Sequence, residues 1–374
     1  MSEKKNAWYE PKNPQNIFSP ALLIYPHRIE ANIKHLIEIA GTVTRLRPHV
    51  KTHKMPQIVA MHQKYGINKL KCATIAEAEM VANCGIPDVL LAYQPVGPTQ
   101  QRLVALAHRF PETQFGCLVD NERVLRELAA VIAQSDVQLN VWIDVDNGNG
   151  RTGIQPGLAA ENLAKLIHDT PQLTFAGFHV YDGQFTGYAI EARTVKATEA
   201  FTPVQEMVKH LAAEGIEVGN IVAGGSPTFS IHALKAEIDL SPGTYVLWDM
   251  GYSTLCPELP FVPAAVLLTR VVSKPTANRL CLDLGHKAVA AENPLDKRVR
   301  FFNAPAAQYI DQKEEHLVIE VANGEDFNIG DTLYGVPWHI CPTVALHQEA
   351  TVINEEGIVV AQWPIVARNR KLEI

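Results

Sequence analysis

The residues best suited to covalent chemistry form one basic run, Arg47-Pro48-His49-Val50-Lys51-Thr52-His53-Lys54. If this run ends a buried strand, alternation puts four basic side chains on one face: Arg47, His49, Lys51 and His53. Neighbouring positive charges disfavour the ammonium form, so crowding is expected to lower the pKa of Lys51. A neutral lysine amine is what Schiff-base formation requires. From the residues alone, a solvated basic loop explains the run equally well.

Two glycine-containing segments could hold a phosphate group. The first is Ala223-Gly224-Gly225-Ser226-Pro227-Thr228, and the second is Ser241-Pro242-Gly243-Thr244-Tyr245. Glycine lets the backbone approach phosphate oxygens, and small hydroxyls add donors. Either segment alone could be a turn. Together they match the positions after the last two strands of a (β/α)8 barrel, where phosphate sites recur.

Two further segments follow expected strands. Residues 144–153 combine Asp144 and Asp146 with three glycines and Arg151. Such a loop could hold calcium, but it lacks the distal glutamate of an EF-hand. In the next segment, His179 and Tyr181 share one face of a strand, and a core position for His179 is preferred.

A separate pair, His339 and Cys341, lies near the C-terminus. On an extended segment both side chains face the same way and could share one ion. Imidazole with thiolate favours zinc over magnesium or calcium. Two protein ligands leave positions for water and substrate, which is typical of a catalytic metal, although most isolated pairs of this kind bind nothing.

The elements that must position these residues change character along the chain. The expected strands are residues 42–47, 68–73, 88–93, 113–119, 137–144, 173–180, 217–224 and 237–246. Residues 77–85 and 121–134 show the apolar spacing of helices. Eight strand–helix repeats predict an α/β fold, a (β/α)8 TIM barrel over residues 20–250. A doubly wound sheet is disfavoured because no GxGxxG follows the first strand.

Beyond Gly251 helical periodicity fades and β-branched runs take over. Residues 262–272, 279–284, 316–322 and 331–336 are expected strands, and 350–363 is an expected hairpin. The sequence therefore predicts a mostly β C-terminal domain over residues 251–374 that carries the metal pair. Residues 1–19 could pack on either domain, and we group them with this one.

Composition excludes several classes of protein. The chain is 47% hydrophobic and 20% charged, which fits a globular protein rather than a disordered one. A net charge of −7 with scattered lysine and arginine disfavours nucleic-acid binding. No apolar run reaches the roughly 18 residues of a membrane span, and the N-terminus has no signal-peptide pattern. Six cysteines without disulfide or CxxC spacing favour a reduced, cytoplasmic enzyme.

The basic run resembles the cofactor-lysine motif of fold-type III pyridoxal-phosphate enzymes. The resemblance is to the D-threonine aldolase and D-serine dehydratase branch of the alanine racemase N-terminal-domain superfamily. It starts at residues 19–33, continues through 70–93 and ends near 339–348. It implies an alanine racemase-like fold and pyridoxal 5'-phosphate on Lys51. The other implied cofactor contacts are Arg151, Tyr181, Gly225, Ser226, Gly243, Thr244 and Tyr245.

The resemblance also implies a divalent metal at His339 and Cys341. Cys341 replaces the carboxylate of some members, which favours zinc over manganese or magnesium. The implied activity is metal-assisted retro-aldol cleavage of a D-3-hydroxy amino acid to glycine and an aldehyde, as in D-threonine aldolases. His49 or His53 would accept the hydroxyl proton. A homodimer acting on small D-amino acids, without nucleic acid or membrane, is expected.

Three other functions remain open. A D-serine or D-threonine dehydratase would use Lys51 as α-proton base and release a 2-oxo acid and ammonia. An amino-acid racemase is disfavoured, because alanine racemases carry a tyrosine shortly after the lysine, where this chain has residues 52–55, Thr-His-Lys-Met. A non-catalytic pyridoxal-phosphate-binding protein would lack the β domain.

Overall fold

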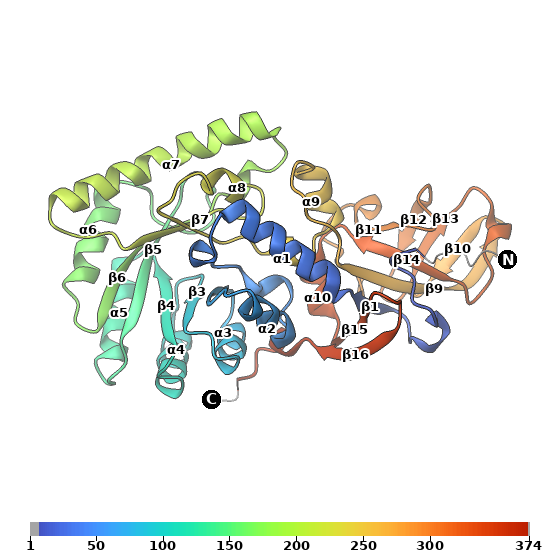
Figure 1. The fold of residues 1–374 in the computed structure, drawn as a ribbon, viewed down its shortest axis with the longest axis horizontal. Helices are drawn as coiled ribbons and strands as arrows, with labels where there is room; N and C mark the ends of the chain where they lie inside the picture. Colours follow the sequence, from blue (N-terminus) through green and yellow to red (C-terminus); the bar gives the residue numbers. More distant parts are fainter. Residues whose placement is uncertain (1–6, 373–374) are drawn as a thin grey trace. The chain divides into compact units, whose positions relative to one another are not determined.

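The chain is described here by a computed structural model that covers residues 7–372. These residues form two compact units (Figure 1). The barrel unit comprises Leu36–Lys51, Pro56–Gly243 and the chain from Asn369 onwards. The β unit comprises the chain up to His35, Thr52–Met55 and Thr244–Arg368. Of residues 1–19, grouped above with the β domain, the first six lie outside the described range.

The barrel unit is built on a parallel sheet of seven strands in the order β2-β3-β4-β5-β6-β7-β8. The strands are β2 (Lys69–Cys72), β3 (Asp88–Leu91), β4 (Gln114–Val119), β5 (Leu139–Val145), β6 (Leu173–Val180), β7 (Asn220–Ala223) and β8 (Ile238–Leu240). Residues 46–49, here called the first stave, link the two sheet edges through the bridges Leu46↔Leu240 and His49↔Lys71. The expected eight-fold strand–helix barrel is therefore confirmed, with one stave irregular.

The irregular stave corrects the expectation of a strand over residues 42–47. Thr42 accepts the Thr44 N–H and starts a 3-10 helix over Val43–Arg45. The Arg45 guanidinium then donates to the Ala233 and Ile238 carbonyls. Pro48 supplies a carbonyl but no N–H to a ladder, and a second 3-10 helix, Val50–Thr52, follows. Strict alternation from Arg47 to His53 is therefore wrong.

Helices follow the strands of the barrel unit: α2 (Pro56–Lys64), α3 (Ile75–Asn83), α4 (Pro98–Arg109), α5 (Glu122–Ile132), α6 (Leu158–His168), α7 (Ile190–Ala213) and α8 (Phe229–His232). α5 illustrates why they form. Asn121 caps it by accepting the Arg123 and Val124 N–H groups, and its apolar face, Val124 to Ile132, is buried. Within residues 7–372, no helix combines the length and apolarity needed to cross a bilayer.

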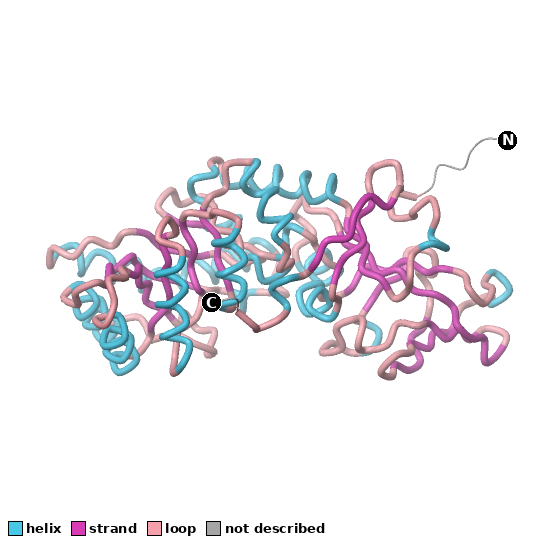
Figure 2. The backbone as a smooth tube through the Cα atoms, turned by 90° about the horizontal axis from the view of Figure 1, so that it is seen from below, coloured by secondary structure: helices cyan, strands magenta, loops and turns pink. Residues whose placement is uncertain are grey.

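The β unit is mostly strand and loop (Figure 2). Its strands are β1 (Ala21–Ile24), β9 (Ala265–Thr276), β10 (Arg279–Leu282), β11 (Val299–Phe301), β12 (Gln308–Gln312), β13 (Leu317–Glu320), β14 (Thr332–Pro337), β15 (Glu349–Ile353) and β16 (Val359–Pro364). The expected mostly β architecture and the hairpin of β15 and β16 are confirmed. Two short helices, α9 (Met250–Leu255) and α10 (Ile340–Leu346), interrupt the strands, and α1 (Pro26–Ala40) starts in this unit.

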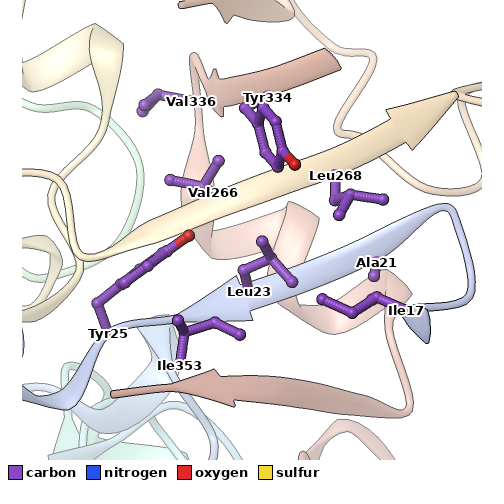
Figure 3. Close-up of a cluster of buried hydrophobic side chains, with 9 residues drawn as sticks. All are labelled: Ile17, Ala21, Leu23, Tyr25, Val266, Leu268, Tyr334, Val336 and Ile353. Atoms are coloured by element: carbon purple, nitrogen blue, oxygen red, sulfur yellow. The ribbon is translucent and has the colours of Figure 1, made fainter. Parts of the chain in front are cut away.

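One apolar cluster joins the central strands of the β unit (Figure 3). β1 pairs with β9 and β15, so Leu23 lies among side chains from both neighbours. Val266 and Leu268 on β9 contribute to this cluster, and Leu267 between them is buried on the opposite face, so both faces of this end of β9 are covered. The hydroxyl of Tyr25 donates to the Tyr9 carbonyl, which satisfies the polar end of a fully buried ring.

A buried histidine predicts acid sensitivity of the fold. His62 on α2 donates from Nδ1 to the Ile58 carbonyl, and burial lowers the pKa of His62 to about 4. Protonation therefore favours the unfolded chain. We expect the free energy of unfolding to fall by about 3 kcal/mol between roughly pH 6.5 and pH 4 through this group. Urea unfolding of wild type and His62→Leu across that range would measure it.

The matched control is His168→Leu, which changes an exposed histidine at the end of α6. The control should keep the wild-type pH slope, whereas His62→Leu should flatten it. Equal slopes in wild type and His62→Leu would contradict the assignment.

Candidate active site

Lys51 lies at the mouth of the barrel unit. It belongs to the 3-10 helix Val50–Thr52, directly after the first stave. The stave runs parallel to β8 and β2, because Leu46 bridges Leu240 and His49 bridges Lys71. Lys51 therefore follows the carboxyl end of a stave, where barrel enzymes gather their reactive groups.

Arg47 has a different surrounding from the one expected of it. Its side chain is 1% exposed, and its guanidinium donates to both carboxylate oxygens of Asp88, at 2.5 and 2.8 Å. A further bond of 3.4 Å reaches Asp239. Two carboxylates thus compensate this cation within the barrel unit, which makes Arg47 a structural ion-pair residue.

The two candidate histidines are both buried but belong to different units. His49 of the barrel unit accepts the Lys51 backbone N–H at Nδ1. Burial, followed by the charges of Lys51, Lys71 and His179, holds the pKa of His49 well below its usual value. A neutral imidazole can accept a proton. His53 of the β unit is fully buried, and its Nδ1 accepts the Met55 N–H.

A second lysine, Lys71 on β2, lies inside the barrel. Its Nζ donates to Ser241 Oγ at 2.6 Å and lies 3.4 Å from His179 Nε2. His179 Nδ1 in turn lies 2.7 Å from Asp144. His179 is therefore buried, as a core histidine would be, but it joins two charged groups.

Sequence reasoning missed Lys71, although a signal was present. Lys69 and Lys71 share one face of β2. A buried parallel strand should be almost entirely apolar, so two lysines are unusual there. Lys69 pairs with Asp239 at 2.9 Å. Lys71 is only 3% exposed and has no carboxylate within ion-pair distance among the described residues. Such a lysine is a functional candidate.

Arg151, Tyr181 and Gly225 meet in the structure although they come from three loops. The Arg151 guanidinium carbon lies 4.6 Å from the centre of the Tyr181 ring. A Cβ at Gly225 would come within 3.0 Å of the same ring, so this position admits no larger residue without displacement. The Arg151 loop is shaped by Asp146, whose Oδ1 accepts the N–H groups of Gly148 and Gly150.

A buried carboxylate holds the first phosphate-type segment in place. Asp182 is fully buried and accepts hydrogen bonds from Thr228 Oγ1 at 2.5 Å and His232 Nε2 at 2.6 Å. Arg193 donates to the Pro227 carbonyl from α7. Gly224, at φ +78°, lies so close to Phe229 that a Cβ would be 2.6 Å from its Cα. Gly225 and Ser226 therefore sit on a rigid turn.

Replacing Asp182 with asparagine tests this clamp. The amide cannot accept from both Thr228 and the His232 ring, and lost charge-assisted bonds are worth about 1.5–3 kcal/mol. If the segment binds phosphate, we expect cofactor affinity to fall about 10-fold. This change corresponds to a loss of roughly 1.4 kcal/mol of binding free energy. Fluorescence titration with pyridoxal phosphate would measure this change.

The control for this substitution is Asp136→Asn, at an exposed loop position of the barrel unit. It should leave cofactor affinity unchanged. If Asp182→Asn binds the cofactor as tightly as wild type but melts at a lower temperature, Asp182 has only a structural role.

The second phosphate-type segment directly follows β8 in the chain. Gly243 ends the barrel unit, and Thr244 and Tyr245 begin the next stretch of the β unit. Thr244–Val246 form a 3-10 helix. Tyr245 is 1% exposed, and burial raises the pKa of its hydroxyl well above the usual value. Tyr245 therefore stays protonated and can only act as a neutral hydrogen-bonding group.

His339 and Cys341 lie together in the β unit, but not on the extended segment expected for them. His339 is the extended N-cap of α10, and Cys341 lies in the first turn. Thr52, the residue after Lys51 in the chain, places Oγ1 3.2 Å from Cys341 Sγ. Thr244 Oγ1 lies 3.7 Å from the same sulfur.

Acidic groups surround His339. Glu292 Oε1 lies 2.5 Å from His339 Nδ1 and fixes the orientation of the ring. Burial alone would lower the pKa of His339, but Cys341, Glu292 and Asp249 outweigh it and raise the value to about 9. Surroundings that attract a proton this strongly also attract a metal cation.

The donor set fits a soft divalent metal with open coordination positions. Histidine nitrogen and cysteine sulfur are zinc ligands, and a carboxylate on the second ring nitrogen is the usual orienting partner. Within residues 7–372, no group of three His, Cys, Asp or Glu side chains is placed to hold a metal. Further ligands would have to come from water or substrate. Glu292 was missed because it is 47 residues from His339.

Two family profiles together cover most of the chain. Residues 24–247 match the profile described as alanine racemase, N-terminal domain. This chain belongs to that family. The family is a fold-type III pyridoxal-phosphate family, so the expected recognition and fold are confirmed. Residues 264–353 match the profile described as putative serine dehydratase domain.

Relatives of this alanine racemase-family chain match it over nearly its whole length. A D-threonine aldolase of Arthrobacter sp is 29% identical over 96% of this chain and 95% of its own. A 3-hydroxy-D-aspartate aldolase of Paracoccus denitrificans (strain Pd 1222) is 27% identical over 95% and 93%. The crystal structure of D-threonine aldolase from Filomicrobium marinum superposes with a TM-score of 0.89 at 25% identity, covering 97% and 98%.

The barrel-unit site fits the cofactor of this family. An aldehyde needs an amine, and Lys51 stands at the barrel mouth. A phosphate needs a rigid turn, and Asp182 holds one through Thr228 and His232. Lys51, Arg151, Tyr181 and Gly225 all fall within the first matched range, and His339 and Cys341 fall within the second.

Proposed function

We propose that this chain is a pyridoxal-phosphate-dependent lyase that cleaves D-3-hydroxy amino acids to glycine and an aldehyde with the help of a divalent metal. One observation carries the proposal. The cofactor lysine and the His339–Cys341 pair occur together in a chain that matches two aldolases of such substrates over 96% and 95% of its length.

Residues that follow the barrel strands in the chain would bind and orient the cofactor. Lys51 would hold the cofactor at its aldehyde carbon through the side-chain amine. Gly225, Ser226, Gly243, Thr244 and Tyr245 hold the phosphate, and Arg151, which packs on the Tyr181 ring, contacts the phenolic oxygen. Pyridoxal phosphate supplies an electron sink for the bond that breaks at the α-carbon.

A histidine accepts the proton of the substrate β-hydroxyl. His49 suits this role because burial keeps its ring neutral and because it lies two residues from Lys51. His53 is the alternative base. General-base assistance of this kind contributes about 100- to 10,000-fold to a rate.

His339 and Cys341 hold the divalent metal, which we assign as zinc. A divalent ion lowers the pKa of a bound hydroxyl group, and this favours cleavage next to it. Glu292 orients His339, and the acidic surroundings of the pair favour a cation.

Dehydration is the second candidate function. The match of residues 264–353 to a serine dehydratase profile favours it. The same lysine and metal would then serve removal of the α-proton and loss of the hydroxyl group, giving a 2-oxo acid and ammonia.

Product analysis separates the two reactions. The protein is incubated with pyridoxal phosphate, zinc and D-threonine, and in parallel with 3-hydroxy-D-aspartate. Glycine with the corresponding aldehyde supports the proposal, whereas a 2-oxo acid with ammonia replaces it by the dehydratase. L-threonine is the stereochemical control. D/L interconversion without either product would favour a racemase.

We also propose a homodimer in a reducing, cytoplasmic compartment. β16 is an edge strand on which Val359 and Val360 are 40% and 57% exposed, and burial against a second copy would remove this apolar surface from water. The cysteines of the described chain are all free thiols. Light scattering at several protein concentrations tests the dimer.

A further inference from the structure

Lys71 is a buried amine to which the proposed mechanism gives no role. It is 3% exposed on β2, and its backbone N–H donates to the Pro48 carbonyl of the first stave. Burying a lysine without an adjacent carboxylate costs several kcal/mol. Buried ionisable side chains of this kind are common at functional sites.

Two hydrogen bonds, to His179 and Ser241, fix the position of this amine, and Asp144 holds His179 in place. His179 comes from β6, Asp144 from β5, and Ser241 directly follows β8. Because Lys71 itself comes from β2, its Nζ lies within the ring of strands rather than along one wall.

The proton positions follow from the same contacts. The His179 ring lowers the pKa of Asp144 despite burial, so this group is a carboxylate. His179 Nδ1 therefore donates to Asp144, and its Nε2 accepts from Lys71. Ser241 Oγ accepts a second Lys71 proton. An ammonium has three protons, so one has no acceptor among the described residues.

The charges that face Lys71 are balanced. Burial is the largest influence, and with the cations of Lys51 and Arg47 it lowers the pKa of Lys71, while Asp144 and Asp182 raise it; the result is about 7. His49 and His179 also face the amine and are held neutral by burial. Lys71 can thus take or release a proton near neutral pH.

The polar groups of the cofactor leave one acceptor unassigned. Its aldehyde carbon takes Lys51, its phosphate takes the two glycine segments, and its phenolic oxygen takes Arg151. The pyridine nitrogen remains. Ser241, which accepts from Lys71, is the first residue of the second phosphate-type segment, and His49 of the stave is in register with Lys71.

We propose that Lys71 donates its remaining N–H to the pyridine nitrogen of pyridoxal phosphate, and this inference rests on the proposed function. A lysine donor keeps the ring nitrogen unprotonated, whereas a carboxylate partner would protonate it. A ring with an unprotonated nitrogen withdraws electrons from the α-carbon less strongly than a ring with a protonated one. Lys71, His179 and Asp144 together would set that demand.

The test compares pyridoxal phosphate with its 1-deaza analogue, in which CH replaces the pyridine nitrogen. Equilibrium dialysis measures the affinity of each for the wild-type protein. We expect wild type to prefer pyridoxal phosphate about 10-fold or more, since bonds involving a charged donor are worth roughly 1.5–3 kcal/mol. Lys71→Met, which keeps the length of the side chain, should lose the preference.

Lys69→Met is the matched control on the same strand. It removes a lysine that pairs with Asp239 instead of His179 and should keep the wild-type preference. Equal affinity of wild type for both compounds overturns the inference without any variant, and so does an undiminished preference in folded Lys71→Met. Failure of wild type to bind pyridoxal phosphate at all would instead refute the proposed function.

Discussion

Lys51→Ala is expected to abolish covalent attachment of pyridoxal phosphate and with it the yellow absorbance that borohydride reduction fixes to the protein. Alanine has no amine to condense with the aldehyde carbon, and neither Lys71 nor Lys54 lies at the position of Lys51. Turnover should fall by more than about 1,000-fold, the order lost when a covalent nucleophile is removed.

Mass spectrometry after borohydride reduction provides the measurement, because the pyridoxyl group marks the peptide that carries the reactive lysine. Lys64→Ala, at the exposed end of α2, is the control and should label fully. A reduced label that persists in Lys51→Ala, on Lys71 or any other residue, would show that the reactive lysine is misassigned.

Removal of His339 or Cys341 is expected to leave the protein without its metal. Each residue is one of two protein ligands of the proposed site, so a single alanine should weaken metal binding by more than the about 10- to 100-fold that loss of an orienting partner costs. Glu292→Gln, which alters only that partner, should fall within the 10- to 100-fold range. Competition with a chromogenic chelator measures zinc affinity in all three variants.

Turnover should follow metal content in these variants. Wild-type activity should be lost with chelator and restored by zinc, whereas His339→Ala and Cys341→Ala should keep a low, chelator-insensitive rate. Cys281→Ala and His286→Ala change the same residue types elsewhere in the β unit and should behave as wild type. A wild-type rate that is indifferent to chelator would refute the metal site.

Patterns along the chain were sufficient for the fold wherever strands are regular. The strands β2 to β8 occur where short apolar runs predict them, because a parallel barrel strand is buried on both faces and selects mostly apolar residues. The first stave was mispredicted, because local contacts override the strand pattern there. The Thr42 cap and the bonds of Arg45 to residues near β8 turn the backbone into a 3-10 helix.

For the site, residue types along the sequence, with their family resemblance, were sufficient to predict Lys51 and the His339–Cys341 pair as candidates, since each is a compact motif whose chemistry depends on nearby residues. Tertiary structure alone decided which groups surround them. Asp182 meets His232, 50 residues away, and Lys71 meets Ser241, 170 residues away. The physical reason is that burial and long-range contacts set the charge of such groups, and a linear sequence specifies neither.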